Sequence, residues 1–121
     1  MTIPSRVLGA GASQLSTIAI CGDGKDNIVA AGTTRADATQ IVSVFNSVDT
    51  VPASSGVKLP PTEAGSVIYI ANSGLSTLTV YPYESTSVIN QTTSASIGKD
   101  HTSIFFAVTN SMWYSINGTK T

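Results

Sequence analysis

The chain has 121 residues, of which 11% are charged, and it carries a net charge of −1 and one cysteine. This length suits one domain, and a single cysteine excludes an internal disulfide. The six Lys and Arg residues are dispersed along the chain, which argues against nucleic-acid binding because phosphate recognition needs clustered positive charge. No run of about 18 apolar residues is present to cross a membrane, and the N-terminus lacks a signal-peptide pattern, so we expect synthesis in a cytoplasm.

Serine and threonine take the place of charged residues over much of the chain, since a typical protein has about 25% charged residues. A hydroxyl-rich surface with few charges suits a broad protein–protein contact, because its burial carries little charge-desolvation cost. A soluble β-rich domain can have the same composition without such a contact. Composition therefore leaves both interpretations open.

Residues 1–34 differ from the rest and are predicted to form an N-terminal arm with the first strand. The apolar residues of this segment are interrupted by Gly9 and Gly11, which disfavour a helix. We expect an extended arm that becomes ordered by lying on another protein, then a strand over 16–21 and a tight turn over 22–27. The alternative is an ordinary first strand with a frayed end.

Residues 35–121 are predicted to form a domain of seven or eight short strands. The β-rich segments, each bounded by turn residues, are 38–45, 56–59, 66–71, 76–83, 87–91, 94–100, 102–110 and 112–117. In the first of them, Ile41 and Phe45 are predicted to point inward. The sequence therefore predicts an all-β fold, with a single antiparallel β-sandwich or jelly-roll-like domain, or else a small barrel, and without an internal repeat.

The clearest local signal lies between residues 66 and 83. A Gly-containing loop at 72–74 separates two β-rich runs, which predicts a hairpin. In the second run Leu78 and Val80 alternate with polar residues, so we expect these two side chains to be buried.

Candidate catalytic groups are few and isolated. His101 is the only histidine, and its neighbour Asp100 would point the other way in a strand. Cys21 lies in an apolar segment, where a cysteine acts as a small hydrophobe. Glu63 and Glu84 would need to face each other across a groove to serve as a glycosidase pair. We expect no enzymatic activity, no metal site and no cofactor.

Aromatic residues are concentrated in the second half of the chain and are the best candidates for a contact surface. Adjacent residues of a strand point to opposite faces, so one of Phe105 and Phe106, and one of Trp113 and Tyr114, faces away from the local core. A second sheet covering these side chains is the alternative. The predicted subunit- or partner-contact residues are Tyr81, Tyr83, Phe106, Trp113 and Tyr114.

The order of segments resembles a module of structural proteins in tailed-bacteriophage virions, including small head decoration (cement) proteins and some fibre or spike domains. The order is an "ANSG" loop, "LTVYP", "VIN", a Ser/Ala-rich stretch ending in "GKD", "SIFFAV" and "MWYSI", within residues 35–117. The matching positions are Asn72, Gly74, Leu78, Val80, Tyr81, Pro82, Ile89, Asn90, Gly98, Lys99, Phe105, Phe106, Trp113 and Tyr114.

This resemblance implies a homotrimeric virion β-domain without enzymatic activity, and it does not decide between head and tail. A small domain with an N-terminal arm and without repeats fits a decoration protein better than a fibre, so we expect the outer surface of the virion capsid. The implied partner is the major capsid protein, which the decoration protein binds at capsomer junctions to stabilise the shell. The arm would supply capsid-contact residues, namely Ile3, Arg6, Val7, Leu8 and Leu15. The alternative function is that of a receptor- or glycan-binding domain of a tail fibre or spike.

Overall fold

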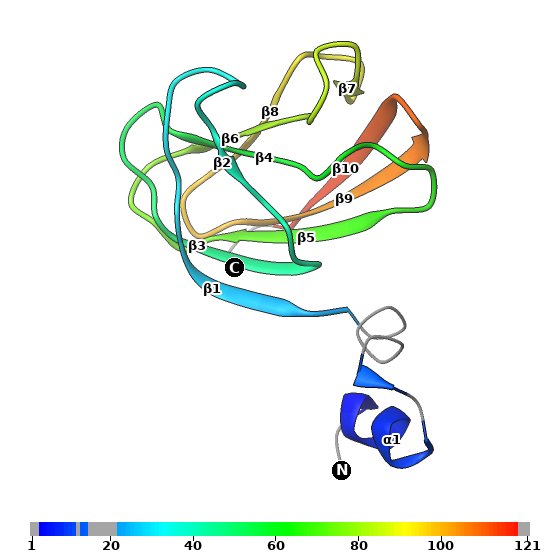
Figure 1. Cartoon of the computed structure of the whole chain (residues 1–121). Helices are drawn as coiled ribbons and strands as arrows, with labels where there is room; N and C mark the ends of the chain where they lie inside the picture. Colours follow the sequence, from blue (N-terminus) through cyan, green and yellow to red (C-terminus); the bar gives the residue numbers. More distant parts are fainter. Residues whose placement is uncertain (1–2, 12, 15–21, 119–121) are drawn as a thin grey trace.

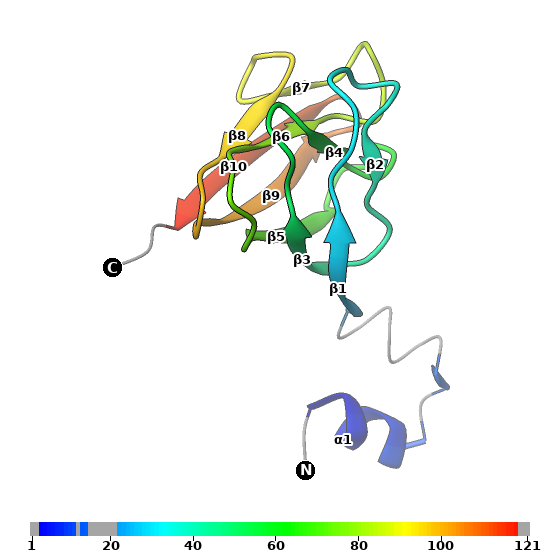
Figure 2. The same ribbon diagram turned by 90° about the vertical axis from the view of Figure 1, so that its left-hand side faces the viewer.

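The computed structural model describes residues 3–11, 13–14 and 22–118, and it is nearly all β. Two β-sheets face each other and enclose the core (Figure 1). A short helix, α1 (Ile3–Gly9), lies apart from the sheets at the N-terminal end of the described chain (Figures 1 and 2). The all-β prediction is thus confirmed for the β-domain.

The larger sheet has six strands in the order β1-β3-β5-β9-β10-β7, and the smaller has four in the order β2-β4-β6-β8. The six-stranded sheet consists of β1 (Gly24–Val29), β3 (Phe45–Thr50), β5 (Val67–Asn72), β9 (Thr102–Thr109), β10 (Met112–Gly118) and β7 (Val88–Ile89). The four-stranded sheet consists of β2 (Thr39–Gln40), β4 (Gly56–Lys58), β6 (Leu78–Tyr81) and β8 (Ala95–Ile97).

The chain from β1 to β6 winds as a solenoid, alternating between the two sheets. β1, β3 and β5 pair in parallel on one side, and β2, β4 and β6 pair in parallel on the other. Gly24 lies beside Phe45, and Phe45 beside Tyr69, so equivalent positions recur after roughly 20–25 residues, a period typical of solenoid coils. The remaining strands complete the sheets, with an antiparallel pair of β9 and β10 joined at Asn110 and Ser111.

The antiparallel jelly-roll prediction is therefore wrong. The sheets are mixed, and the coils repeat in structure without repeating in sequence. The predicted hairpin at 72–74 is instead a corner: β5 pairs with β3 and β9, whereas β6 pairs with β4 and β8. A loop with turn residues between two β-rich runs is expected both for a hairpin turn and for a corner between two sheets. The local sequence pattern alone therefore does not distinguish the hairpin from the corner.

Asn72 and Gly74 give this corner its shape. The Asn72 Oδ1 atom accepts a hydrogen bond from the Gly74 amide at 3.0 Å, and its Nδ2 donates to the carbonyls of Ser76 at 2.8 Å and Ile97 at 2.9 Å. A Cβ on Gly74 would come within 2.9 Å of the Val51 backbone nitrogen. The corner therefore needs a buried amide and a residue without a side chain, a requirement that a solvent-exposed hairpin turn does not have.

The N-terminal segment also differs from the prediction. Residues 3–9 form a helix where an extended arm was expected, and the helix ends at Gly9. The predicted strand over 16–21 lies outside the described residues. The predicted tight turn over 22–27 overlaps β1. The backbone of this strand is irregular there, with a bulge and with a positive φ of 55° at Asn27.

The core lies between the sheets and follows the alternation of each strand. Leu78, Val80 and Ile41 are buried as predicted. Phe45, predicted to point inward, points outward instead and is 44% exposed. The segment 38–45 is two strands joined by a bend at a change of sheet, so a single period-two count across it assigns its last residue to the wrong face.

Candidate functional site: an apolar outer sheet face

Seven apolar or aromatic side chains form two rows on the outer face of the six-stranded sheet, on four adjacent strands. Two rows cross these strands at right angles to the chain. The register aligns Phe45 of β3, Tyr69 of β5, Ile104 of β9 and Ile116 of β10 in the first row. It aligns Val67, Phe106 and Tyr114 in the second row. We call these seven residues the apolar face.

In β3, β5 and β9, and at Trp113 of β10, the inward neighbours of these residues are buried, which fixes the orientation of the face. In β9, Ser103, Phe105 and Ala107 are buried while Ile104 and Phe106 are partly exposed. Ile116 is 59% exposed. The strands of the apolar face therefore have apolar side chains on both sides, a pattern usual for a sheet covered on both faces.

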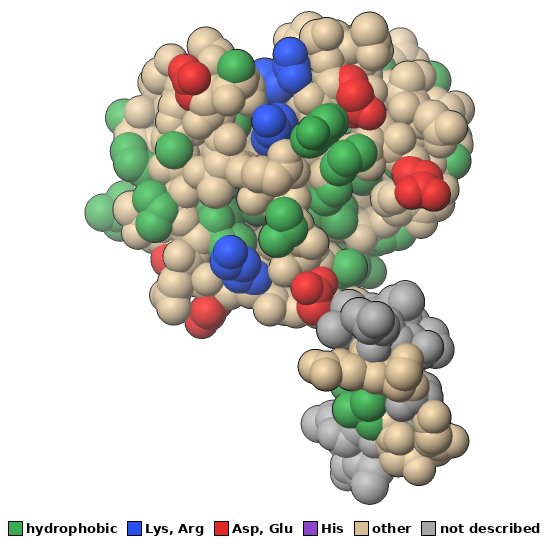
Figure 3. Space-filling model, in the orientation of Figure 1, with side chains coloured by type: hydrophobic (Ala, Val, Ile, Leu, Met, Phe, Trp, Pro, Cys, Tyr) green, Lys and Arg blue, Asp and Glu red, His purple; other side chains and the backbone are tan. Residues whose placement is uncertain are grey.

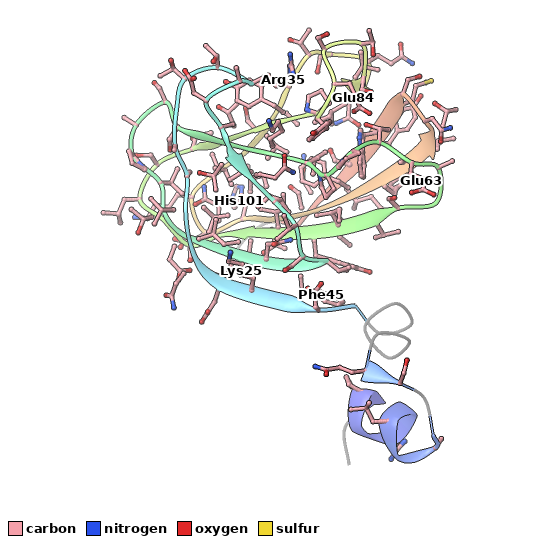
Figure 4. All side chains as sticks on the ribbon, in the orientation of Figure 1. Lys25, Arg35, Phe45, Glu63, Glu84 and His101 are labelled. Atoms are coloured by element: carbon pink, nitrogen blue, oxygen red, sulfur yellow. The ribbon has the colours of Figure 1, made fainter. Side chains whose placement is uncertain are left out.

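Two aromatic pairs order the apolar face. The rings of Phe45 and Tyr69 stack with their centroids 4.6 Å apart, and those of Phe106 and Tyr114 stack at 6.2 Å. These distances lie within the range of favourable aromatic pairs. The outward side chains thus form a continuous apolar surface and not a set of isolated exposed residues. Figure 4 shows Phe45 on the outer side of the six-stranded sheet.

The outer face of the four-stranded sheet is polar. Its rows contain Thr79 beside Ser96 on one line and Gln40, Lys58 and Tyr81 on another. The Lys58 ammonium lies 5.1 Å from the Tyr83 ring centroid. Over the side of the molecule drawn in Figure 3, charged side chains are few and scattered among neutral ones.

The edges of both sheets are short or irregular. β1 ends the larger sheet with a bulge and with the charged residues Lys25 and Asp26, and β7 ends it with two residues. The edge strands of the smaller sheet, β2 and β8, have two and three residues. Such edges disfavour the addition of a strand from another chain, which leaves the apolar face as the main feature open to a partner.

The predicted contact residues of the β-domain fall into three places. Phe106 and Tyr114 belong to the apolar face. Tyr81 and Tyr83 lie in and just after β6 of the other sheet. Trp113 is 0% exposed, so its prediction as a contact residue is wrong. In β10 it is Tyr114 that faces outward, because Trp113 fills the core and its Nε1 donates to Thr62 Oγ1 at 2.8 Å.

The predicted arm residues Ile3, Arg6, Val7 and Leu8 all lie in α1. Leu8 is 45% exposed and Arg6 is also exposed. Leu15 lies outside the described residues. The helix that carries the first four of these residues lies apart from the six-stranded sheet (Figures 1 and 2).

The carboxylates considered for catalysis do not form a pair. Glu63 follows Thr62, which donates to the Glu84 carboxylate, and Figure 4 shows Glu63 and Glu84 on the same side of the β-domain with separate side chains. The Glu84 carboxylate accepts hydrogen bonds from Thr62 Oγ1 at 2.7 Å, from the Thr62 amide at 3.1 Å and from Ser87 Oγ at 3.3 Å. Partial burial raises the pKa of Glu84, but these hydrogen bonds outweigh it, so that the pKa lies below its ordinary value. Glu84 is thus a structural anchor of the loops.

Asp49 has a similar role at the start of the solenoid. Its carboxylate accepts hydrogen bonds from Ser47 Oγ and Ser73 Oγ, both at 2.7 Å, and from the Asn27 amide at 3.0 Å. The two serine hydrogen bonds hold the pKa of Asp49 below its ordinary value. This cluster joins three consecutive coils at one corner.

Within the described ranges, no three His, Cys, Asp or Glu side chains gather as a metal site, and no helix has the length and apolarity needed to cross a membrane. Cys21 is not among the described residues. His101 lies beside Gly98, in a loop that faces the Asn72 corner.

Comparison with known proteins yields no relative: no family model matches the chain, and no curated protein or solved structure shows significant similarity. The functional interpretation therefore rests on the chain's own residues.

Sequence reasoning identified two residues of the apolar face and missed Phe45, Val67, Tyr69, Ile104 and Ile116. A usable signal was present in β9, where apolar residues occupy inward and outward positions alike in "SIFFAV". What the sequence did not reveal was the register that aligns these positions with β3, β5 and β10. That register depends on the parallel winding of the coils.

Proposed function

We propose that this protein is a capsid decoration protein of a tailed bacteriophage, which binds the outer surface of the head at capsomer junctions and stabilises the shell. The apolar face is the observation that carries this proposal. Monomeric soluble proteins rarely expose a continuous apolar patch of this kind unless it binds a partner. The order of motifs within residues 35–117, which resembles virion structural proteins, supplies the kind of partner.

The composition of the surface suits a protein that works by assembly. Its few charges reduce the desolvation cost of broad contacts, and many identical copies on a shell add weak contacts through effective concentration. The helix α1, which lies apart from the sheets and exposes Arg6 and Leu8, is a second element through which the chain would reach the shell.

Immunogold labelling of virions whose genome encodes this chain tests the proposal. We expect label over the whole head. Heads prepared without the protein should bind the purified chain when it is added back, and should become more resistant to heat. Absence of label from the head, or failure of such heads to bind the chain, would refute the proposal.

Receptor or glycan binding by a tail fibre or spike is the competing function. Arg35, Tyr81 and Glu84 line a pocket of about 260 Å³, but Arg35 Nη1 already donates to the Tyr83 carbonyl at 2.7 Å and Glu84 is held by Thr62. The buried Trp113 removes the most suitable residue for stacking on a sugar. Label confined to the tail tip would favour this function.

A further inference from the structure

We propose that Asn117 is a site of spontaneous deamidation, at which reaction with water converts a neutral side chain into aspartate or isoaspartate. Asn117 and Gly118 are the last two residues of β10, and both are exposed. The inference goes beyond the proposed function and does not depend on it, because the reaction needs only this chain and water.

The reaction begins when the Gly118 amide nitrogen gives up its proton and attacks the side-chain carbon Cγ of Asn117. The Cγ–Nδ2 bond breaks, and the side-chain nitrogen takes up that proton and leaves as ammonia, so that a five-membered cyclic imide remains. Water then adds to one of the two ring carbonyls: opening at Cγ gives aspartate, and opening at the backbone carbonyl gives isoaspartate. Attack within one chain is favoured by proximity, and Gly118 has no side chain to hinder its nitrogen.

Ser103 supports this reaction at the side-chain oxygen of Asn117. Its Oγ donates a hydrogen bond to Asn117 Oδ1 at 2.5 Å, and Ser103 itself is buried. Oδ1 gains negative charge when Cγ is attacked, and a hydrogen-bond donor held beside such an oxygen stabilises the transition state. The Nδ2 atom, which has to leave, donates no hydrogen bond to any described residue.

The end of β10 gives the Gly118 nitrogen the freedom that attack requires. Gly118 pairs with Thr102 in the last position of the β9–β10 register. On the other side of β10, β7 pairs only with Met112 and Trp113, so among the described strands β9 alone pairs with residues 116–118. The terminal pairs of a sheet open at little cost in free energy, and opening of this one pair releases the attacking nitrogen.

The other asparagines lack this combination of features. None of the remaining five is followed by glycine; they are Asn27, Asn46, Asn72, Asn90 and Asn110. Two of them, Asn46 and Asn72, are buried. Asn90 uses both of its side-chain polar atoms in hydrogen bonds to Ser115, and Asn110 accepts a hydrogen bond from a backbone amide at 3.0 Å. The structure therefore singles out one asparagine of six.

Both products change the end of β10. Each adds a negative charge beside Ile116, which belongs to the uncharged apolar face, in a chain whose net charge is −1. The isoaspartate also lengthens the backbone by one carbon, which removes Gly118 from its register with Thr102. Chains that have spent longer in water should therefore differ from new chains at this end of the sheet.

Timed incubation of the full chain in mildly alkaline buffer, followed by tryptic digestion and tandem mass spectrometry, tests the inference. One tryptic peptide, residues 100–120, contains both Asn110 and Asn117, so the two sites are compared in the same molecule. We expect conversion at Asn117 to exceed that at every other asparagine of the folded chain. Part of the product should carry isoaspartate, which protein isoaspartyl methyltransferase labels.

Three variants separate the contributions of the neighbouring residues. Gly118→Ala should slow the conversion, because a methyl group hinders the nitrogen. Ser103→Ala should slow it by about fivefold, the rate equivalent of one net hydrogen bond. Ser55→Ala is the matched control, since Ser55 is also buried but lies beside β4 of the other sheet, and it should react like the wild type. Circular dichroism checks that all of these proteins are folded.

A folded chain that keeps Asn117 intact, over a period in which the urea-unfolded chain converts it, would overturn the inference. Equal conversion at Asn110 would also overturn it. A wild-type rate in Ser103→Ala would refute the role of Ser103. If Ser103→Ala does not fold, Gly118→Ala decides, because a Cβ at this exposed position comes no closer than 3.3 Å to any other residue, and an unchanged rate in this variant would refute attack by the Gly118 nitrogen.

Discussion

The two sheets of this domain have similar inner faces and different outer faces. The inner faces share one core, to which Leu78 and Val80 of the smaller sheet and Phe105 and Trp113 of the larger contribute. Outside, the smaller sheet presents mainly polar side chains and one aromatic residue, Tyr81, whereas the larger presents Phe45, Tyr69, Phe106 and their neighbours. Alternation of apolar and polar side chains is the pattern of a strand whose outer face meets water. A strand with apolar side chains on both faces has a second surface available for contact.

The difference is not a consequence of folding alone. An apolar side chain on a solvated sheet face contributes little to the stability of the monomer, and its exposure favours association and aggregation. The smaller sheet shows that this chain can build a stable outer face from hydroxyls. Retention of four aromatic rings on the larger sheet is therefore best explained by a contact in the assembled state.

The largest expected effect comes from the pair Trp113 and Tyr114, adjacent in β10 and on opposite faces. Trp113→Ala should lower the free energy of unfolding by about 3–5 kcal/mol, because it empties a fully buried site and leaves Thr62 without its indole donor. Tyr114→Ala should cost less than about 1.5 kcal/mol in the monomer, since it removes one aromatic pair from a partly exposed face. Urea unfolding at low protein concentration measures both. Equal costs would contradict the assigned faces.

The same test applies to the smaller sheet at Leu78 and Thr79. Leu78→Ala should cost about 2–5 kcal/mol because the side chain is buried. Thr79→Ala should stay within about 0.5 kcal/mol, as expected for a surface substitution away from special contacts. A loss below about 1 kcal/mol for Leu78→Ala would place that residue on the surface and shift the register of β6 by one.

Gly74→Ala tests the corner that takes the chain from the larger sheet to the smaller. A Cβ there would lie 2.6 Å from Val51 Cγ2 and 2.9 Å from the Val51 amide nitrogen, so the corner must shift, at a cost of about 1–3 kcal/mol. Gly65→Asn is the control that separates steric from backbone effects. A Cβ added at Gly65 would meet nothing within 4 Å, and the φ of this residue is +92°. Asn is chosen because it tolerates a positive φ. Thermal unfolding of Gly74→Ala that matches the wild type would indicate a hairpin-like, open turn.

The smallest expected effect is the pH dependence contributed by Glu84. Its pKa is lower in the folded chain than the ordinary value of 4.5. It therefore stabilises the fold fully above about pH 4.5, and this contribution is lost as the pH falls through the folded pKa. Glu84→Gln should lower stability at neutral pH by about 1–2 kcal/mol and should flatten the decline in acid. Unfolding curves between about pH 3 and 7 give the comparison, and parallel profiles for both proteins would show that Glu84 is not anchored.

The local features of the sequence predicted much of the secondary structure. The strands β4 and β6 to β9 lie within their predicted segments, and β5 and β10 each extend one residue beyond theirs. Leu78 and Val80 are buried as their alternation indicates. These are short-range properties, set by side-chain periodicity and turn residues. The assignment of one outward aromatic in each adjacent pair was also correct, although the sequence did not show that Trp113 is the inward one.

The strand pairing could not be predicted from those features. A parallel solenoid coil and an antiparallel hairpin use the same loop residues, and the decision between them rests on long-range contacts such as the hydrogen bond from Asn72 to Ile97. The strand β1 was missed because Gly24, Asp26 and Asn27 are turn residues by composition, and they form a bulged edge strand only because β3 lies beside them. The apolar face could not be predicted for the same reason, because its rows exist only in the register of β3, β5, β9 and β10.

Hydroxyl-radical footprinting as a function of protein concentration, read by mass spectrometry, tests most directly whether the apolar face is buried in the working state. Tyr69, Phe106 and Tyr114 report on the apolar face, and Tyr83, 40% exposed after β6, reports on the other side. We predict that the oxidation of the first three residues falls as the chain assembles while that of Tyr83 stays constant. Unchanged oxidation of all four residues at every concentration, and also on heads, would contradict the account.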